Sequence, residues 1–234
     1  MHRVRAPGAL SAAICVGLAT GGTADAGTPW EVWPELSGFI GMTPQTRLYL
    51  DAASPTDRDA PSKELELGAY LDVSLKPILR PSLFAYDWQR SRYLWARVGY
   101  VHIAEWNPGE RTHSEERGVA SLWGKLELPA RVWLESRLRA DLRWIDGDRS
   151  ERYRIRLEAT RELLVLDHVV VPYLNAEVMY DTRYDGWARA LAQAGAELTL
   201  TEHFRLELYL LRQTDWLPDS ASLNALGVVA KWFY

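Results

Sequence analysis

Apolar and polar residues alternate with a period of two between Arg131 and Trp144, in the stretch "RVWLESRLRADLRW". A helix would spread the charged residues around its whole axis, whereas a strand places alternate residues on opposite faces. The turn "DGDRS" at 146–150 carries an Asp-Gly hairpin signal. After it, the segment 151–159 alternates in the same way, with its arginines on the even positions. The pattern predicts an antiparallel hairpin with one arginine-rich face and one apolar face.

The same alternation recurs along the rest of the chain and predicts about twelve strands. The predicted strands span 29–38, 45–52, 63–75, 80–88, 91–104, 115–128, 131–145, 150–164, 168–181, 186–200, 203–216 and 222–234. An even number of strands is expected of a closed bacterial barrel whose N- and C-termini lie on the same side of the membrane.

The length of these strands favours a membrane barrel over a soluble sandwich or a lipocalin-like barrel. Several strands run to about 13 residues, whereas soluble strands have about 5 to 6 and a membrane crossing takes roughly 9 to 11. Soluble barrels also fill their interior with apolar side chains, but here the charged face is dense and bulky. Tryptophans stand near strand ends, as interfacial girdles require: Trp30, Trp33, Trp88, Trp106, Trp144, Trp187, Trp216 and Trp232. We therefore expect an all-β fold, a transmembrane antiparallel β-barrel.

The segment 1–26 has the layout of a secretory signal peptide. Arg3 and Arg5 precede an apolar run at 9–19, and a small-residue "ADA" ends at Ala26. The apolar run is too short for a membrane-spanning helix of roughly 20 residues. We expect cleavage after Ala26 and a barrel domain over 27–234. Cys15 is the one cysteine, so the processed chain would have no disulfide and no thiolate metal site.

Composition and charge argue against several classes of function. The formal net charge is −4, and it becomes −5 without Arg3, Arg5 and Asp25, so there is no basic excess for binding nucleic acid. The chain is 47% hydrophobic with 11 tryptophans and 11 tyrosines, yet its mean hydropathy is −0.23, which fits finely interleaved residues. It has no HExxH motif, glycine-rich phosphate loop or calcium loop. We expect no cofactor and no metal.

The chain ends on "LGVVAKWFY", with Trp232 and Tyr234 on the same parity. This ending looks like the assembly signal that outer-membrane barrels present to the barrel-assembly machinery. An ordinary edge strand is the alternative, but it would leave an unpaired hydrophobic edge of the kind that soluble proteins avoid.

Four stretches together resemble a known family. They are "WEVWPEL" at 30–36, "RSERYRIRLEA" at 149–159, "VPYLNAEVMYD" at 171–181 and the aromatic last strand. They resemble the outer-membrane β-barrels described as domain of unknown function 2490, over essentially the whole chain after the signal peptide. The resemblance implies the outer membrane of a Gram-negative envelope, with membrane lipid and lipopolysaccharide as partners, but no established activity. A more distant architectural likeness is to small twelve-stranded porins for acidic oligosaccharides, and a shared fold does not give function.

If the apolar faces meet lipid, the charged side chains must point into the lumen, because an arginine on the lipid face would cost about 2 to 4 kcal/mol at the membrane midplane. The predicted lumen-lining residues are Arg137, Arg139, Arg143, Arg152, Arg154, Arg156, Glu64, Glu66, Glu158, Glu177, Glu197 and Glu207. Two interpretations stay open. Arginines and glutamates can pair across the interior and plug it, or they can line a porin-like channel that passes small anionic solutes.

The other interpretations are a closed structural barrel, a partner of an envelope export apparatus, and a lipid-modifying enzyme. The stretch "THSEE" at 112–116 is the one place where His, Ser and acids cluster, and we expect it in a surface loop. No nucleophile elbow and no strand-held His-Ser pair is evident, so we expect no catalytic residues. With a periplasmic N-terminus, the connection at 53–63 would also be periplasmic, although it is longer than periplasmic turns usually are. We expect a monomer.

Overall fold

The computed structural model describes residues 30–54, 56–57, 63–77, 88, 91–106, 113–216 and 222–234. The predicted signal peptide lies outside the described residues, as does the predicted strand 80–88 apart from Trp88. The strands are β1 (Trp30–Gly41), β2 (Thr46–Ala53), β3 (Thr56–Asp57), β4 (Lys63–Pro77), β5 (Arg92–Trp106), β6 (His113–Leu128), β7 (Val132–Ile145), β8 (Asp148–Arg161), β9 (Leu163–Val165), β10 (His168–Asp181), β11 (Gly186–Thr199), β12 (Phe204–Asp215) and β13 (Leu223–Phe233). In the part of the chain that the structure describes, no helix has the length and apolar character needed to cross a membrane.

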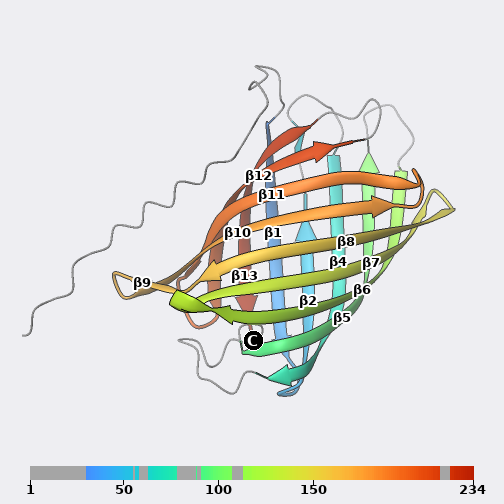
Figure 1. Ribbon diagram of the computed structural model, residues 1–234. Coiled ribbons are helices and arrows are strands. Elements are labelled where there is room, and N and C mark those ends of the chain that lie inside the picture. Colours follow the sequence, from blue (N-terminus) through green and yellow to red (C-terminus); the bar gives the residue numbers. More distant parts are fainter. Residues whose placement is uncertain are drawn as a thin grey trace, which may run out of the picture.

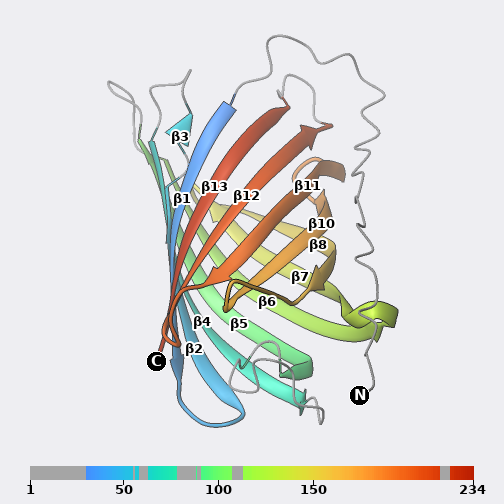
Figure 2. The same cartoon turned by 90° about the vertical axis from the view of Figure 1, so that its left-hand side faces the viewer.

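The long strands form one closed ring (Figures 1 and 2). Its order is β1, β2, β4, β5, β6, β7, β8, β10, β11, β12 and β13, and β13 pairs with β1 to close it. The expected all-β antiparallel barrel is confirmed, with eleven long strands among the described residues and β3 and β9 as short additions. Each of these eleven strands has a predicted counterpart whose bounds agree within three residues.

The closure of the ring differs from the expected even count. With eleven strands among the described residues and antiparallel neighbours everywhere else, β1 and β13 point the same way and pair in parallel. Their register runs from Trp30 opposite Asn224 to Phe39 opposite Phe233. β1 therefore begins at one end of the barrel and β13 finishes at the other, as Figure 2 shows.

The ring order also corrects the side assigned to the connection between β2 and β4. β3 pairs with the start of β1, Glu31 opposite Asp57, and Lys63 lies opposite Trp106. This is the end that carries the turns 146–147 and 182–185, called the upper end from here on. The connection was expected at the opposite, lower end, because the extra strand 80–88 would have reversed the direction of every strand before it.

Two-residue turns set the register of the arginine hairpin and of its neighbours. Asp146 and Gly147 have φ of 51° and 97°, the pair of positive angles that a type I′ hairpin turn requires. Ala130 with Arg131, and Leu166 with Asp167, adopt positive φ as well. These turns bring consecutive strands side by side with matched twist.

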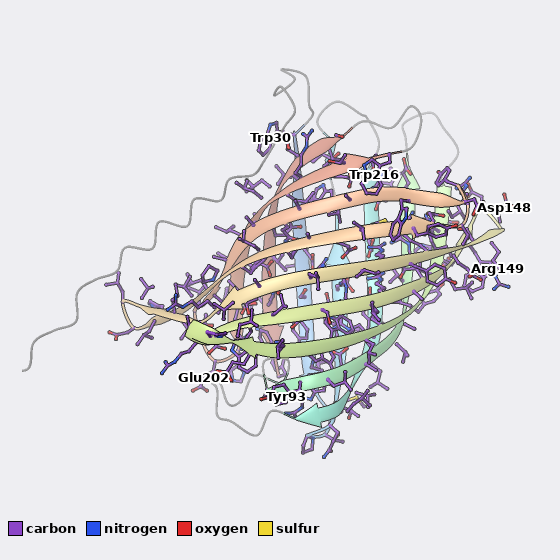
Figure 3. All side chains as sticks on the ribbon, viewed as in Figure 1. Trp30, Tyr93, Asp148, Arg149, Glu202 and Trp216 are labelled. Carbon is purple, nitrogen blue, oxygen red and sulfur yellow. The ribbon has the colours of Figure 1, made fainter. Side chains whose placement is uncertain are left out.

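The outer face of the barrel is apolar and the inner face is mixed. Leu36 is 62% exposed, Leu126 57% and Leu138 53%, all pointing outward, whereas Trp95 and Asp72 are fully buried inside. Exposed tryptophans stand near the strand ends, for example Trp30 and Trp216 at the upper end in Figure 3. Trp33 is an exception to the predicted girdle, because it packs inside the barrel against Tyr209, Ala225 and Val229.

Candidate functional site

The arginine hairpin is built by β7 and β8, whose register sets Arg137 opposite Arg156 and Arg139 opposite Arg154. Like charges that lie directly opposite one another on one face of a sheet repel. The hairpin therefore needs carboxylates between its arginines, and the structure supplies them from β7 itself and from the next strand.

Asp141 and Glu177 bind the central arginines. Asp141 accepts from Arg139 Nε at 2.6 Å and lies 3.1 Å from Arg154 Nε. Glu177, on β10, pairs with Arg137 and lies 2.8 Å from Arg156 Nε and 3.6 Å from Arg154 Nη1. Both carboxylate side chains are 0% exposed, so two acids that are shielded from water pair with four arginine side chains that are 12 to 28% exposed.

A second pair of acids binds the arginines nearer the upper end. Asp181 accepts from Arg143 Nη1 at 2.6 Å and from Arg152 Nη2 at 2.9 Å. Glu115, on β6, accepts from Arg143 Nη2 at 2.8 Å and also pairs with Arg117. We call the four acids and their arginines the arginine–carboxylate layer; its members are Glu115, Arg117, Arg137, Arg139, Asp141, Arg143, Arg152, Arg154, Arg156, Glu177 and Asp181.

The glutamates that were predicted to line the lumen lie in different surroundings. Glu177 joins the arginine–carboxylate layer, and Glu66 lies 3.5 Å from Arg117. Glu158 accepts a hydrogen bond from Asn175 at 3.3 Å. Glu64 lies on the inward parity of β4 opposite Glu105. Glu197 and Glu207 do not face the arginine hairpin but belong to a separate cluster.

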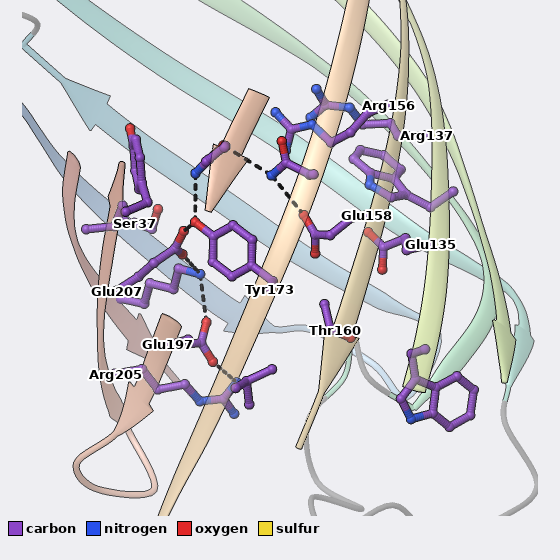
Figure 4. Close-up of a pocket in the computed structure, with 18 of the residues that line it drawn as sticks. Ser37, Glu135, Arg137, Arg156, Glu158, Thr160, Tyr173, Glu197, Arg205 and Glu207 are labelled. Carbon is purple, nitrogen blue, oxygen red and sulfur yellow. Dashed lines mark hydrogen bonds and ion pairs between the residues drawn. The ribbon is translucent and has the colours of Figure 1, made fainter. Parts of the chain in front are cut away.

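That separate cluster is a chain of hydrogen bonds across β10 to β13 (Figure 4). Lys231 Nζ lies 2.7 Å from Glu197 and 2.5 Å from Glu207. Tyr173 donates to Glu207 and accepts from Gln193 at 2.7 Å. Because each polar group is satisfied by a group on another of these strands, and two of the contacts span a strand between them, this network fixes the relative positions of four strands.

A cavity of about 300 Å³ lies beside this cluster and below the arginines. Its wall combines charged groups with aromatic rings, among them Glu35, Tyr49, Trp123, Glu158, Tyr173 and Phe233. Figure 4 shows Arg137 and Arg156 on one side of it and Arg205 with Glu197 on another. The cavity belongs to the lower half of the barrel, and the central arginines form its boundary.

Sequence reasoning missed a third inner cluster on β2, β4 and β5. Asp72, fully buried, accepts from Arg47 Nε at 2.8 Å and from Arg97 Nε at 2.6 Å. The Arg97 guanidinium lies 4.0 Å from the centre of the Tyr49 ring, so the cations stack on aromatic faces as well as pairing with acid. The inward parity of Asp72 was visible in the sequence, but its two partners depend on strand pairing.

The two residues of the expected assembly signal lie at the lower end. Trp232 is 45% exposed and packs on Phe204 with ring centres 4.5 Å apart. Tyr234 donates its backbone N–H to Phe39 O at 2.8 Å, across the parallel seam. The last residues are thus paired with β1 rather than left as a free edge.

The expected surface loop at 112–116 is partly wrong, since β6 begins at His113 and includes Ser114 and Glu116. His102 Nδ1 lies 2.8 Å from Glu116 Oε1, on the outer face. His168 opens β10, and His203 Nδ1 lies 2.8 Å from the carbonyl oxygen of Phe233. Among the described residues, no group of three or more His, Cys, Asp or Glu side chains is arranged to hold a metal ion.

Known proteins resemble the chain in sequence and in fold. Residues 77–224, more than half of the chain, match the model of the family described as protein of unknown function (DUF2490). The crystal structure of the β domain of the Bordetella autotransporter BrkA has a similar fold, with a TM-score of 0.50 and 14% identity, over 86% of this chain and 96% of that one. No curated protein matches. The family match runs from the end of β4 to β13 and includes every strand of the arginine–carboxylate layer, so the chain belongs to the DUF2490 family of proteins of unknown function.

Proposed function

We propose that this protein is an integral outer-membrane β-barrel whose lumen is closed at rest by the arginine–carboxylate layer. The apolar outer face and the exposed tryptophans at the strand ends support a membrane location, because only a closed sheet pairs every backbone group of membrane-spanning strands. The fold it shares with an autotransporter β domain agrees with this proposal.

We further propose that the lower end faces the periplasm. The exposed aromatic residues Trp232 and Tyr234 stand there, and we take them as the signal for the barrel-assembly machinery. The upper end would then face outward, toward lipopolysaccharide. A tag inserted at Asp146–Gly147 should be reached by antibody on intact cells, and a tag at Thr201–His203 should not. The reverse pattern, or recovery of the protein in the soluble fraction, would overturn the proposal.

The single observation that supports a closed lumen is that all six predicted arginines are already bound to carboxylates. An anion-selective pore needs guanidinium groups that are free to exchange partners with a passing solute. Here three of the acceptors, Asp141, Glu177 and Asp181, are 0% exposed. The contacts therefore favour a structural barrel over the porin-like anion channel.

Proteoliposome swelling tests the closed lumen. Vesicles that hold the purified protein should swell no faster in a small sugar or in an ammonium or chloride salt than vesicles without it. A variant with Arg139→Ser, Asp141→Ser and Arg154→Ser removes three neighbouring side chains from the layer and should admit solute. Rapid swelling with the unaltered protein would contradict the proposal.

A further inference from the structure

A histidine and a carboxylate form a hydrogen-bonded pair on the outer face of the barrel, near the upper end. His102 Nδ1 lies 2.8 Å from Glu116 Oε1, and Tyr100 donates to the other oxygen of Glu116. The two side chains are 43% and 36% exposed. A carboxylate that holds Nδ1 fixes the imidazole orientation and leaves Nε2 for a reacting group. Such a pair is not needed to stabilise the inner face, since it lies outside the lumen.

A serine lies next to this pair on the same face. His102 is directly opposite Glu116, and Ser114 is opposite Ala104, so Ser114 is a diagonal neighbour of His102. Diagonal neighbours on one face of a sheet are within reach of a long side chain. Ser114 is exposed, and its backbone is fixed by Asp146, whose N–H donates to Ser114 O at 3.2 Å. A strand-held Ser, His and Glu set is therefore present, and two of its members, Ser114 and Glu116, belong to the stretch that was expected in a surface loop.

The surface beside this set suits a lipid. Below Glu116 on β6 comes Gly118, where an added Cβ would meet nothing closer than Leu142 at 4.0 Å, followed by Ala120 opposite Ala140. These small residues lie between the exposed side chains of Val98, Tyr100 and Leu138. A shallow, apolar strip thus runs from the polar set toward the middle of the barrel wall, along the path that an acyl chain of a bound lipid would take.

Charged and aromatic groups at the rim suit the headgroup of the same lipid. Trp144 lies opposite Glu116 and is 38% exposed. Arg149, labelled at the rim in Figure 3, lies opposite Trp144 with a side chain that is 64% exposed. An interfacial aromatic with a nearby guanidinium is a combination that accommodates a lipid phosphate.

We propose that Ser114, His102 and Glu116 form an esterase site that removes a fatty-acyl chain from an outer-membrane lipid. The Ser114 Oγ–carbonyl carbon bond forms while the Ser114 proton moves to His102 Nε2. The carbon–oxygen bond of the ester then breaks, and the proton passes from His102 to the leaving alcohol. Water attacks the acyl-serine, gives one proton to His102, and the fatty acid leaves as that proton returns to Ser114. Glu116 acts as a positioning residue.

Fatty-acid release by the full-length protein tests this proposal. The purified barrel is mixed with phosphatidylethanolamine vesicles in one arm and with lipopolysaccharide in the other, and released acids are measured by mass spectrometry. One arm or both should give release, which identifies the lipid. Ser114→Ala and His102→Gln should each lower the rate about 100-fold or more. A fluorophosphonate probe should label the unaltered protein and not the Ser114→Ala variant.

Matched controls separate chemistry from folding. His203→Gln removes a histidine bonded to a backbone carbonyl at the lower end and should leave the rate unchanged. Heat-modifiable gel migration of every variant reports whether the barrel is intact. Glu116→Gln should lower kcat and leave KM unchanged, because the imidazole of His102 loses the carboxylate that orients it, and Glu116→Asp should restore part of kcat; a merely structural role would not give this split. No release in either arm together with no labelling would overturn the proposal, as would full activity in Ser114→Ala.

Discussion

At the scale of single residues, Glu177 forms more ion pairs in the arginine–carboxylate layer than any single arginine does. It is fully buried and contacts Arg137, Arg154 and Arg156, which come from two neighbouring strands. Three guanidinium groups that share one carboxylate repel one another as soon as that carboxylate loses its charge. Removing one partner of a buried ion pair leaves an uncompensated charge, which is the costly way to break such a pair.

We therefore expect Glu177→Gln to lower the free energy of unfolding by about 3 to 5 kcal/mol. Urea unfolding of the protein in lipid vesicles, followed by tryptophan fluorescence, measures the change. The matched control is Glu151→Gln at the upper rim, where Glu151 pairs with Arg149 at 2.9 Å and the two side chains are 37% and 64% exposed. That control should leave the midpoint unchanged. Equal midpoints for both variants would contradict the role of Glu177.

At the scale of strands, glycines let aromatic rings lie flat across neighbouring strands inside the barrel. A Cβ added to Gly227 on β13 would stand 1.9 Å from Tyr209 Cζ. Tyr209 is 9% exposed and belongs to the inner cluster with Ala225 and Val229. The ring therefore occupies the space over the strand that any other residue at 227 would fill.

Gly227→Ala should lower the free energy of unfolding by about 1 to 3 kcal/mol, because the Tyr209 ring must shift within a packed interior. Gly38→Ala is the matched control. Gly38 lies on β1 in the same seam, and a Cβ added there would meet nothing closer than Leu50 O at 4.0 Å. Vesicle unfolding curves of the two variants give the comparison. A larger effect at Gly38 than at Gly227 would show that the seam, and not the ring, limits this position.

Strands were predictable from the sequence where one face is wholly apolar. The alternation of Leu134, Leu138 and Leu142 with charged residues reflects a physical constraint that acts on one strand alone, so β7, β8 and β10 to β13 were predicted with bounds that agree within three residues, whereas the short β9 was not predicted as a separate strand. The partners of the arginines were not predictable. Asp141 and Asp181 have the right parity, but their contacts depend on how strands pair. Trp33 shows the same limit, because an aromatic near a strand end can point either way.

At the scale of the whole molecule, the parallel seam sets how the barrel closes. It joins β1 to β13 over ten residue pairs, while every other junction of the ring is antiparallel. Whether β1 and β13 pair in parallel or antiparallel follows from the number of strands in the ring. No local sequence pattern encodes that number. The predicted strand 80–88 was enough to reverse the expected direction of β1, β2 and β4.

A designed disulfide tests this closure. Leu36 lies opposite Ala230 on the outer face, and the chain has a single cysteine, Cys15, in the predicted signal peptide. Leu36→Cys with Ala230→Cys should form a cross-link on oxidation, because directly paired Cα atoms fall within disulfide range. The control pair Leu36→Cys with Val228→Cys is two residues out of register and should cross-link far less, as measured by gel migration with and without reductant. Preferential linking of the control pair would exclude the parallel register.

The central claim, that paired arginines close the lumen, is tested most directly by single-channel recording in planar lipid bilayers. The account predicts no steady conductance from the unaltered barrel, and clear openings once Arg139, Asp141 and Arg154 are all replaced by serine. These three side chains are joined by ion pairs of 2.6 and 3.1 Å, and their removal leaves the other acids of the layer in place. A steady, anion-selective conductance from the unaltered protein would contradict the account.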